Sequence, residues 1–529
     1  MYRFLAISSF ILSNCLIFAQ SPDVLWQKTY GGTSFDLLYD LVACSDGNYL
    51  LIGYSGSSAS GNCTESTNGI TDYWVLKIDS DGNILWQNKY GGNERDNLFR
   101  ALETPDGGYL LLGQSLSPPS GNKTAPLYGG YDIWLVKIDS NGEIVWDKTY
   151  GGDNVEFISS AIETSYGYVL VSDSYSGISG NKTTPNLGAS DVWLIGIDFM
   201  GNILWQQSYG GSSWDFAYDG IKTNDNSLIL VSSSSSTSSG DFSQNNYGGR
   251  DYWILKLDIN GNLLWQQNYG GSGFDEARRI IETSDQDYLI VGFSNSPISG
   301  IKNSVNYGGN DIWIIKIDFN GNIIWENSYG GSFDDASSNM IETNNGYFIT
   351  GSSLSGISGN KTEIGYGDYD FWGFKIDEDG TIIWQKSIGG SLSDGCNSIV
   401  KNLDGTFLLA GTSRSPISGT KTVASYGDSD YWLVKLDEET LNSESFTNTI
   451  FSIYPNPVKD YLTIAFEKHL DVIIVEFYNL LGQKIYTNNY HNQNNIKIDC
   501  RNLPEGVFSA TISTNEGKYN QKLIKKTDH

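Results

Sequence analysis

The 529-residue sequence predicts an all-β fold, with a seven-bladed β-propeller followed by a small β-sandwich. Three observations predict it: two tryptophan motifs recur at a period of 59 or 60 residues, each period divides into four strand-like runs, and the repeat stops before a different C-terminal segment. A fixed period of this size indicates a solenoid, a propeller or an array. Fourteen of the 15 tryptophans belong to the two motifs: Trp26, Trp86, Trp146, Trp205, Trp265, Trp325 and Trp384 in G-N-I-L-W-Q, and Trp74, Trp134, Trp193, Trp253, Trp313, Trp372 and Trp432 in D-x-W.

Each period contains four short runs that are rich in β-branched and aromatic residues. In the second copy they are DNLFRALET, GGYLLLGQS, YDIWLVKID and GEIVWDKTYGG. The Asn-Gly and Asp-Gly pairs between such runs favour tight hairpins, because these residues tolerate positive φ. Four antiparallel strands in about 60 residues correspond to one propeller blade.

The phase of the repeat predicts a closed ring. The chain enters at residues 24–30 with a fourth-strand sequence and leaves the repeat at residues 431–436 with a third-strand sequence. The first strand is therefore expected to complete the last blade, which hides sheet edges that an open stack would expose. A β-helix is the structural alternative, although its rungs are usually shorter than this period.

The repeat also resembles a known group of sequences. A run of the ILWQKTYGG type (VLWQKTYGG at residues 24–32), followed by D-x7-T, GGYLLLG and DIWLVKIDSNG, is similar to the repeats of bacterial seven-bladed β-propellers in exported proteins. The resemblance covers residues 22–437, and we assign residues 21–437 to the propeller. It implies the fold and leaves the activity open, because propellers serve many functions.

The N-terminal residues 1–20 are predicted to be a secretory signal peptide. Arg3 precedes an apolar run, and Ala19 is a plausible cleavage site. A membrane anchor is the alternative, but the apolar run is short of the roughly 20 residues that a span needs. Asn14 argues against a lipoprotein site at Cys15. No later segment is apolar enough to cross a membrane, so an exported, soluble protein is expected.

The charge of the repeat region limits its partners. Residues 21–450 hold 23 basic and 53 acidic residues, a net charge of −30. Such a surface repels nucleic acid and anionic lipid, so we expect neither as a partner, whereas divalent cations remain an option. The remaining cysteines, Cys44, Cys63, Cys396 and Cys500, form neither a disulfide framework nor a zinc pattern.

Three series of acidic residues recur at fixed positions of the repeat. An acid of the third series opens each turn after a D-x-W strand and is expected to accept hydrogen bonds from nearby backbone amides. Residues 79–83, DSDGN, resemble the start of a calcium loop, but its later ligands are missing. We therefore expect no cofactor, with Ca²⁺ as a weaker alternative. For the first two series backbone capping is again predicted, with acidic sites for a sugar hydroxyl or a cation as the alternative. The series are Asp36, Asp96, Glu156, Asp215, Asp275, Asp335 and Asp394; Asp72, Asp132, Asp191, Asp251, Asp311, Asp370 and Asp430; and Asp79, Asp139, Asp198, Asp258, Asp318, Asp377 and Asp437.

One variable polar position is predicted to face the central channel. It lies four residues after each acid of the first series, and the apolar positions near it hardly vary. Asp40, Arg100, Asp219 and Arg279 at this position are candidates for an axial ligand-binding site. Ion pairs that merely fill the channel are the alternative. The seven residues are Asp40, Arg100, Ser160, Asp219, Arg279, Asn339 and Ser398.

Trp214 is the one tryptophan outside both motifs. It lies in the loop GGSSWD, on the face that carries the Tyr-Gly-Gly motifs. An exposed aromatic residue there is a candidate platform for a sugar or a peptide. The alternative is that the side chain packs against its own loop and stabilises the loop.

The sequence after residue 437 differs from the repeat. Residues 438–449 are polar and are predicted to be a linker. In residues 450–529 strand-like runs alternate with Pro/Gly turns, as in a small β-sandwich. This segment resembles the C-terminal sorting domain of the type IX secretion system of Bacteroidetes. The resemblance implies Sec export, passage through the outer membrane with the type IX machinery as partner, and release or attachment at the surface. It rests on Tyr454–Pro457 with Lys459 and Asp460, Tyr478–Gln483, Leu503–Phe508 and Lys522–Lys526.

These features together favour a non-enzymatic binding or adhesion module, secreted or held at the cell surface. Its candidate ligands are a glycan or a surface protein. The first alternative is a polysaccharide-acting hydrolase or lyase with a carboxylate pair such as Asp40 and Asp219 in the channel. The second is a purely structural surface scaffold. Near-identical blades supply copies of residues, whereas catalysis needs differentiated groups.

Overall fold

The computed structural model describes residues 21–244, 246–437, 451–455, 457–478, 484–501, 503–504, 506–514 and 517–526. The predicted signal peptide and linker lie outside these residues. Every regular element in the described part of the chain is a β-strand. The chain divides into two compact units, residues 1–438 and 439–529.

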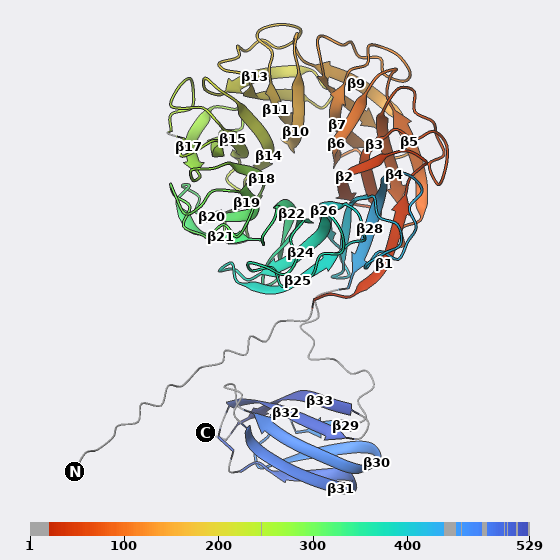
Figure 1. The fold of residues 1–529 in the computed structure, drawn as a ribbon, viewed down its shortest axis with the longest axis vertical. Coiled ribbons are helices and arrows are strands. Elements are labelled where there is room, and N and C mark those ends of the chain that lie inside the picture. The colour runs from red at the N-terminus through yellow and green to blue at the C-terminus, as the bar shows by residue number, and fades with distance from the viewer. Residues whose placement is uncertain are drawn as a thin grey trace, which may run out of the picture. The chain divides into compact units, whose positions relative to one another are not determined.

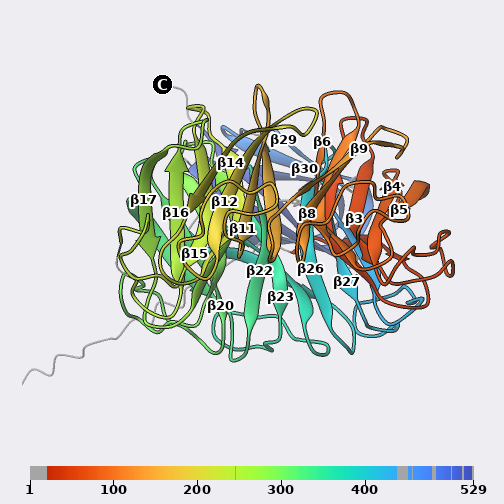
Figure 2. The same ribbon diagram turned by 90° about the horizontal axis from the view of Figure 1, so that it is seen from above.

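The first unit consists of repeated four-stranded antiparallel sheets. Figure 1 shows them arranged in a ring like the blades of a β-propeller, and Figure 2 shows the strands of neighbouring sheets, such as β22, β23 and β26, running side by side. Six sheets follow chain order from the inner to the outer strand: β2 (Asp36–Ala43), β3 (Tyr49–Ser55), β4 (Asp72–Ile78), β5 (Ile84–Tyr90); β6 (Asp96–Glu103), β7 (Tyr109–Ser115), β8 (Asp132–Ile138), β9 (Ile144–Tyr150); β10 (Glu156–Glu163), β11 (Gly167–Ser174), β12 (Asp191–Asp198), β13 (Ile203–Tyr209); β14 (Asp215–Lys222), β15 (Leu228–Ser234), β16 (Asp251–Leu257), β17 (Leu263–Tyr269); β18 (Asp275–Glu282), β19 (Tyr288–Ser294), β20 (Asp311–Ile317), β21 (Ile323–Tyr329); and β22 (Asp335–Thr343), β23 (Gly346–Ser353), β24 (Asp370–Ile376), β25 (Ile382–Ile388).

The seventh sheet joins the two ends of the repeat. Its inner strands are β26 (Asp394–Lys401), β27 (Phe407–Ser413) and β28 (Asp430–Leu436), and its outer strand is β1 (Val24–Tyr30). β1 pairs antiparallel with β28, with Tyr30 opposite Tyr431. The first described strand thus covers an edge that β28 would otherwise leave unpaired.

The two tryptophan series differ in burial. All seven D-x-W tryptophans are fully buried between neighbouring sheets, where Trp134, for example, packs against Tyr73 of the preceding sheet with ring centroids 4.7 Å apart. The tryptophans of the outermost strands are only half-buried, apart from Trp384. The outermost strand of a sheet has no strand beyond it, so part of each of these six rings faces solvent.

The Tyr-Gly-Gly motifs pack against each other at the ends of the strands. The motif before β16 lies beside the motif after β17, and the amide of Gly249 donates to the carbonyl of Gly273 at 2.7 Å. A Cβ atom on Gly248 would lie 2.3 Å from the carbonyl oxygen of Gly271. The repeated glycines therefore allow two backbone segments to meet where a side chain would not fit.

The inner strand of every sheet carries a β-bulge at the same place. Its register shifts between the second and fourth residues after the first-series acid, as between Leu38 and Asp40 in β2. A bulge leaves one residue without a partner and re-aims nearby side chains. The seven unpaired residues, here called the bulge residues, are Tyr39, Phe99, Ser159, Tyr218, Arg278, Ser338 and Asn397.

The second unit contains one connected five-stranded antiparallel sheet. Its long strands β30 and β31 pair in two segments separated by an irregularity between Ala465 and Leu470. Apolar side chains from both segments, including Leu462, Phe477 and Ile498, share one buried cluster. The sheet therefore folds over a common core. The strands are β29 (Phe451–Tyr454), β30 (Tyr461–Tyr478), β31 (Lys484–Asp499), β32 (Gly506–Thr514) and β33 (Gly517–Lys525).

Candidate functional site

The inner strands surround a cavity of about 660 Å³, here called the mouth cavity. All seven bulge residues line it, so every sheet contributes to its wall. Phe157, Phe216 and Ala336 line it too, and each is the second residue of its strand. The cavity therefore lies toward the end of the channel that carries the Tyr-Gly-Gly loops. Its size is that of a small-molecule site.

A second cavity of about 300 Å³, here called the deep cavity, lies further along the channel. Its lining includes all four channel residues predicted as ligand contacts: Asp40, Arg100, Asp219 and Arg279. Arg100 and Arg279 line both cavities. The structure thus places these four side chains together, from four different sheets.

The bulge residues are the part of the site that sequence reasoning missed. Strict alternation along a strand would point the residue before each channel position away from the channel. The bulge breaks that alternation and brings both residues to the cavities. A signal was present, because this position varies between sheets as Tyr, Phe, Ser, Tyr, Arg, Ser and Asn.

Asp40 is held by an ion pair and a hydrogen bond. Its Oδ2 lies 3.4 Å from Nη1 of Arg100, and its Oδ1 accepts a hydrogen bond from the hydroxyl of Ser398 at 2.9 Å. Arg100 also donates from Nε to the carbonyl of Ser159 at 3.3 Å. This part of the channel agrees with the ion-pair alternative.

Asp219 and Arg279 form no such pair among the described residues. The amide of Ile280 approaches the Asp219 carboxyl at 3.4 Å. Burial raises the pKa of Asp219, and the charge of Arg100 partly opposes the increase. The side chain of Arg279 has no hydrogen bond or ion pair with any residue that the structure describes. Its guanidinium group is therefore free to bind a ligand in either cavity.

Arg278 and its neighbours form a stacked ionic group beside the mouth cavity. Its Nη2 lies 2.6 Å from Oε1 of Glu276, and Oε2 of the same acid is 2.6 Å from Arg250. The Arg278 guanidinium lies over the ring of Tyr218, 4.7 Å from its centroid. Arg250 lies similarly over Phe216, at 4.5 Å. Glu276 is thus neutralised by two cations that also cover aromatic rings.

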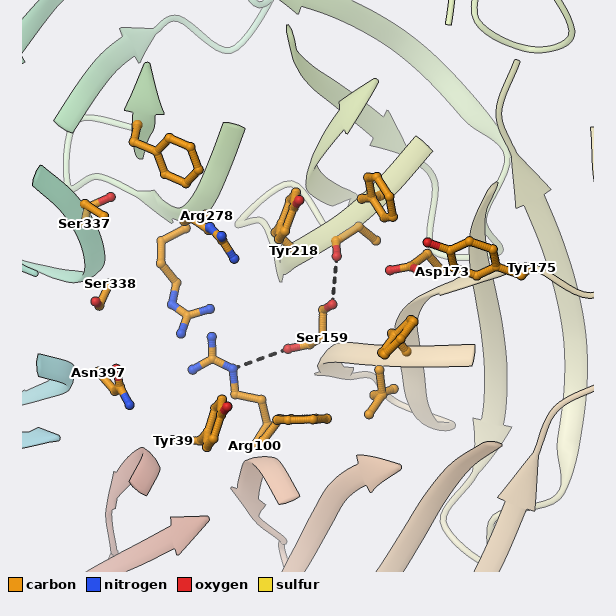
Figure 3. A pocket seen from close by; sticks show the side chains of 18 residues that line it. Tyr39, Arg100, Ser159, Asp173, Tyr175, Tyr218, Arg278, Ser337, Ser338 and Asn397 are labelled. Atoms are coloured by element: carbon orange, nitrogen blue, oxygen red, sulfur yellow. Dashed lines mark hydrogen bonds between the residues drawn. The ribbon is translucent and has the colours of Figure 1, made fainter. Parts of the chain in front are cut away.

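Asp173 is a buried acid in the wall of the mouth cavity. It belongs to β11, the residue is 4% exposed, and its Oδ2 has no hydrogen-bond partner among the residues that the structure describes. Burial raises the pKa of Asp173 well above its ordinary value, although the amide of Ala217 and the charge of Arg250 oppose this. A protonated carboxyl group can donate a hydrogen bond. Figure 3 shows Asp173 and Tyr175 on one side of the cavity, with Ser337, Ser338 and Asn397 on the other.

The three acidic series accept hydrogen bonds from backbone amides. Gly32 donates to Asp36 at 2.7 Å, Asn68 donates to Asp72 at 2.5 Å, and Asn83 donates to Asp79 at 2.8 Å, one example from each series. The capping predicted for these residues is therefore present. No group of three or more His, Cys, Asp and Glu in the described ranges is arranged to hold a metal ion.

Acids of the first two series face each other in pairs. Burial raises the pKa of Asp72 to about 6, and the charge of Asp96 in the next sheet adds to the increase. The same causes raise the pKa of Asp251 to about 7, with Asp275 as its neighbour. Two neighbouring carboxylates repel each other, so the ionisation of both members of a pair costs free energy.

Trp214 lies apart from the other candidates. Its side chain is 49% exposed, and it lines neither cavity. Its carbonyl accepts a hydrogen bond from the amide of Ser235 at 2.8 Å, which anchors the loop through the backbone. The indole is therefore a separate exposed feature of the Tyr-Gly-Gly face.

Comparisons with known proteins identify the C-terminal unit. Residues 452–526 match the secretion system C-terminal sorting domain. No curated protein sequence matches the chain. In the described part of the chain, no helix is long and apolar enough to span a bilayer.

Solved structures with similar folds are distant in sequence. The hydrazine synthase of Kuenenia stuttgartiensis is 13% identical, with a TM-score of 0.39 over 71% of this chain and 94% of that chain. Puromycin hydrolase is 9% identical, with a TM-score of 0.43 over 82% of this chain and 59% of that one. The plexin A4 extracellular region is 7% identical, with a TM-score of 0.44 over 94% and 53%.

A sorting domain of this kind implies export, interaction with the type IX secretion machinery, and a final location at the outer membrane, at the cell surface or outside the cell. The repeated four-stranded sheets are those of a β-propeller. Residues 452–526 are thus a C-terminal sorting domain of the type IX secretion system, and they follow a β-propeller in the same chain.

Proposed function

We propose that this protein is an exported binding protein, secreted or attached to the cell surface, that does not catalyse a reaction. Its closed seven-bladed propeller binds a ligand in the mouth cavity, and its C-terminal domain directs it through the outer membrane. The observation that carries the proposal is the convergence of seven bulge residues, of five residue types, on one cavity of about 660 Å³. Identical blades would give seven equal surfaces, whereas this cavity is single and asymmetric.

The differences between blades support a binding site over a scaffold. Residues that serve each blade's fold recur in every sheet, as the capping acids do. The bulge residues instead vary between aromatic, hydroxyl, amide and guanidinium groups at one structural position. Such variety has no use in the folding of each blade, and it suits recognition of one unsymmetrical ligand.

The arrangement of acids favours binding over hydrolysis. A carboxylate pair such as Asp40 and Asp219 would need one free acid and one free base. Asp40 is already engaged by Arg100 and Ser398. No histidine occurs before residue 469. The raised pKa of Asp219 is the one feature that an acid catalyst would share.

A glycan array and a cell-surface pull-down test the proposal. The protein is expected to retain a ligand, and Phe99→Ala is expected to weaken retention at least tenfold because it removes part of the cavity wall. Trp214→Ala is the matched control, an aromatic truncation outside the cavity. Loss with Trp214→Ala alone would place the site on the loop face, and reducing-end release abolished by Asp219→Ala would make the protein an enzyme.

A further inference from the structure

We propose that the mouth cavity binds an acidic oligosaccharide, a sugar chain that bears carboxylate or sulfate groups. The acidic group would lie against Arg100 and Arg279, and a sugar ring would lie against the aromatic wall. This inference rests on the proposed binding function and names the class of ligand.

The distribution of arginine is the first observation. Residues 21–450 contain 53 acidic and only 23 basic residues, and six of the basic ones are arginines. Three of these six, Arg100, Arg278 and Arg279, line the mouth cavity. In a propeller whose net charge repels anions, half of the arginines meet in one place. A local cationic site inside an acidic surface selects a small anionic group over a long polyanion.

The unused hydrogen-bond donors are the second observation. A guanidinium group has five N–H donors. Arg279 uses none of them with any residue in the described ranges, and Arg100 uses one hydrogen bond at 3.3 Å beside a 3.4 Å ion pair. Both side chains are only partly exposed. Partly desolvated guanidinium groups bind carboxylate and sulfate through paired, charge-assisted hydrogen bonds.

The surrounding acids do not neutralise these two donors completely. Asp40 pairs with Arg100, and Glu276 is shared by Arg250 and Arg278. The remaining acids, Asp173 and Asp219, lie in surroundings that favour the protonated form. Among the described residues Arg279 therefore has no acidic partner, and its charge is available to an incoming anion.

The aromatic wall is the third observation. Phe216 and Tyr218 are covered by Arg250 and Arg278. Phe99 and Phe157 also line the cavity and remain partly exposed. Such rings present apolar faces to the C–H groups of a sugar. Hydroxyl and amide side chains across the cavity from Asp173 and Tyr175, Ser338 and Asn397 among them, can pair with sugar hydroxyls (Figure 3).

The buried carboxyl group of Asp173 is the fourth observation. Asp173 is 4% exposed, and its Oδ2 has no hydrogen-bond partner among the described residues, which is costly for a charged carboxylate. Burial raises the pKa of Asp173 well above its ordinary value, so this part of the cavity wall repels an anionic ligand less than an exposed carboxylate would. Together these groups offer a positive charge, an apolar surface and hydrogen-bonding side chains within one cavity.

Calorimetric titration of the purified protein with defined trisaccharides tests the inference. The probes are trigalacturonate, a sulfated galactose trisaccharide and neutral galactotriose. At least one acidic trisaccharide is expected to bind at least tenfold more tightly than galactotriose. Arg279→Gln is expected to reduce this binding at least tenfold, whereas Arg95→Gln, the same change at an exposed arginine outside the cavity, leaves it unchanged. Thermal unfolding of both variants checks that the fold is kept.

The outcomes separate the ligand class from the binding function. Equal or tighter binding of galactotriose, lost in Phe99→Ala, would overturn the acidic class and leave the mouth cavity as a binding site. Acidic binding that survives Arg279→Gln would overturn the inferred contact. No binding of any trisaccharide would overturn the inference, and a glycan array and pull-down that are also empty would remove the proposed function with it.

Discussion

Single side chains in the channel differ in a way that the repeat does not require. The position of Asp173 is occupied in other sheets by tyrosine, glutamine, serine, phenylalanine and threonine, as at Tyr54 and Gln114. Burial raises the pKa of the acid at this position well above its ordinary value. The sheets of this propeller therefore differ from one another in single side chains that line the channel.

Replacing Asp173 by Asn tests its protonation state. At pH 7 Asp173→Asn is expected to change the free energy of unfolding by less than about 1 kcal/mol, because one neutral hydrogen-bonding group replaces another. The raised pKa means that the folded state holds the proton more tightly than the unfolded state. The wild type should therefore lose stability relative to the variant as the pH rises. Urea unfolding at pH 5 and pH 8 measures this, and a loss of several kcal/mol at both pH values would show an ionised, paired carboxylate instead.

At the scale of strands and sheets, the 59- or 60-residue repeat predicts the fold, whereas the β-bulge of the inner strands forms the site. The tryptophan spacing and the turn residues around runs such as Asp132–Ile138 predict four strands per repeat, and the described strands have those bounds to within a few residues. The bulge was not predictable, because no residue type demands it and its effect is only a change of register. Four of the five predicted site residues nevertheless meet at the cavities, since the channel position varies where the core positions do not.

The two tryptophan series predict different energetic effects within one sheet. Trp253→Ala removes a side chain that is 0% exposed and a hydrogen bond to Gln266, and is expected to cost about 3–5 kcal/mol. Trp265→Ala removes a half-buried ring on the outer strand β17 and is expected to cost about 1–2 kcal/mol. Chemical denaturation of the two variants compares them. Equal losses would mean that the outer strand is packed as tightly as the third.

Seven buried carboxyl pairs predict how the stability of the whole propeller depends on pH. The pKa values of Asp72, Asp370 and Asp430 are raised to about 6, and those of Asp132, Asp191, Asp251 and Asp311 to about 7, in each case chiefly by burial. The folded state therefore binds more protons than the unfolded state between about pH 4 and pH 7.

Stability is accordingly expected to fall as the pH rises through this window and to change little just above it. The turn acids such as Asp79 and Asp258 have lowered pKa values and lose their contribution only at lower pH. The urea midpoint should be higher at pH 5 than at pH 8, and Asp251→Asn should flatten the slope. A midpoint that rises with pH over this range would contradict the paired, partly protonated state.

Pairing of the first strand with the last sheet predicts a strong effect of a short deletion. Removing residues 21–30 exposes the edge of β28, and is expected to lower the thermal midpoint and to cause association through that edge. Removing residues 438–529 deletes the separate C-terminal unit and should leave the propeller's midpoint unchanged. Calorimetry with light scattering measures both. A propeller that tolerates the first deletion as well as the second would not depend on that pairing.

Chelation is expected to have no effect on the propeller. In the residues that the structure describes, the repeated acids accept hydrogen bonds from backbone amides, and no metal-binding group of three is present. EDTA should therefore leave the thermal midpoint unchanged at constant ionic strength. A fall of several degrees would show that a bound cation stabilises the fold.

The most direct measurement is a crystal structure of the protein with trigalacturonate at saturating concentration. The trisaccharide is expected in the mouth cavity, with one carboxylate within hydrogen-bond distance of Arg279 and a sugar ring against Phe99 or Phe157. A trisaccharide bound at Trp214 or on the outer rim of the sheets, with the mouth cavity empty, would contradict a binding function for the channel.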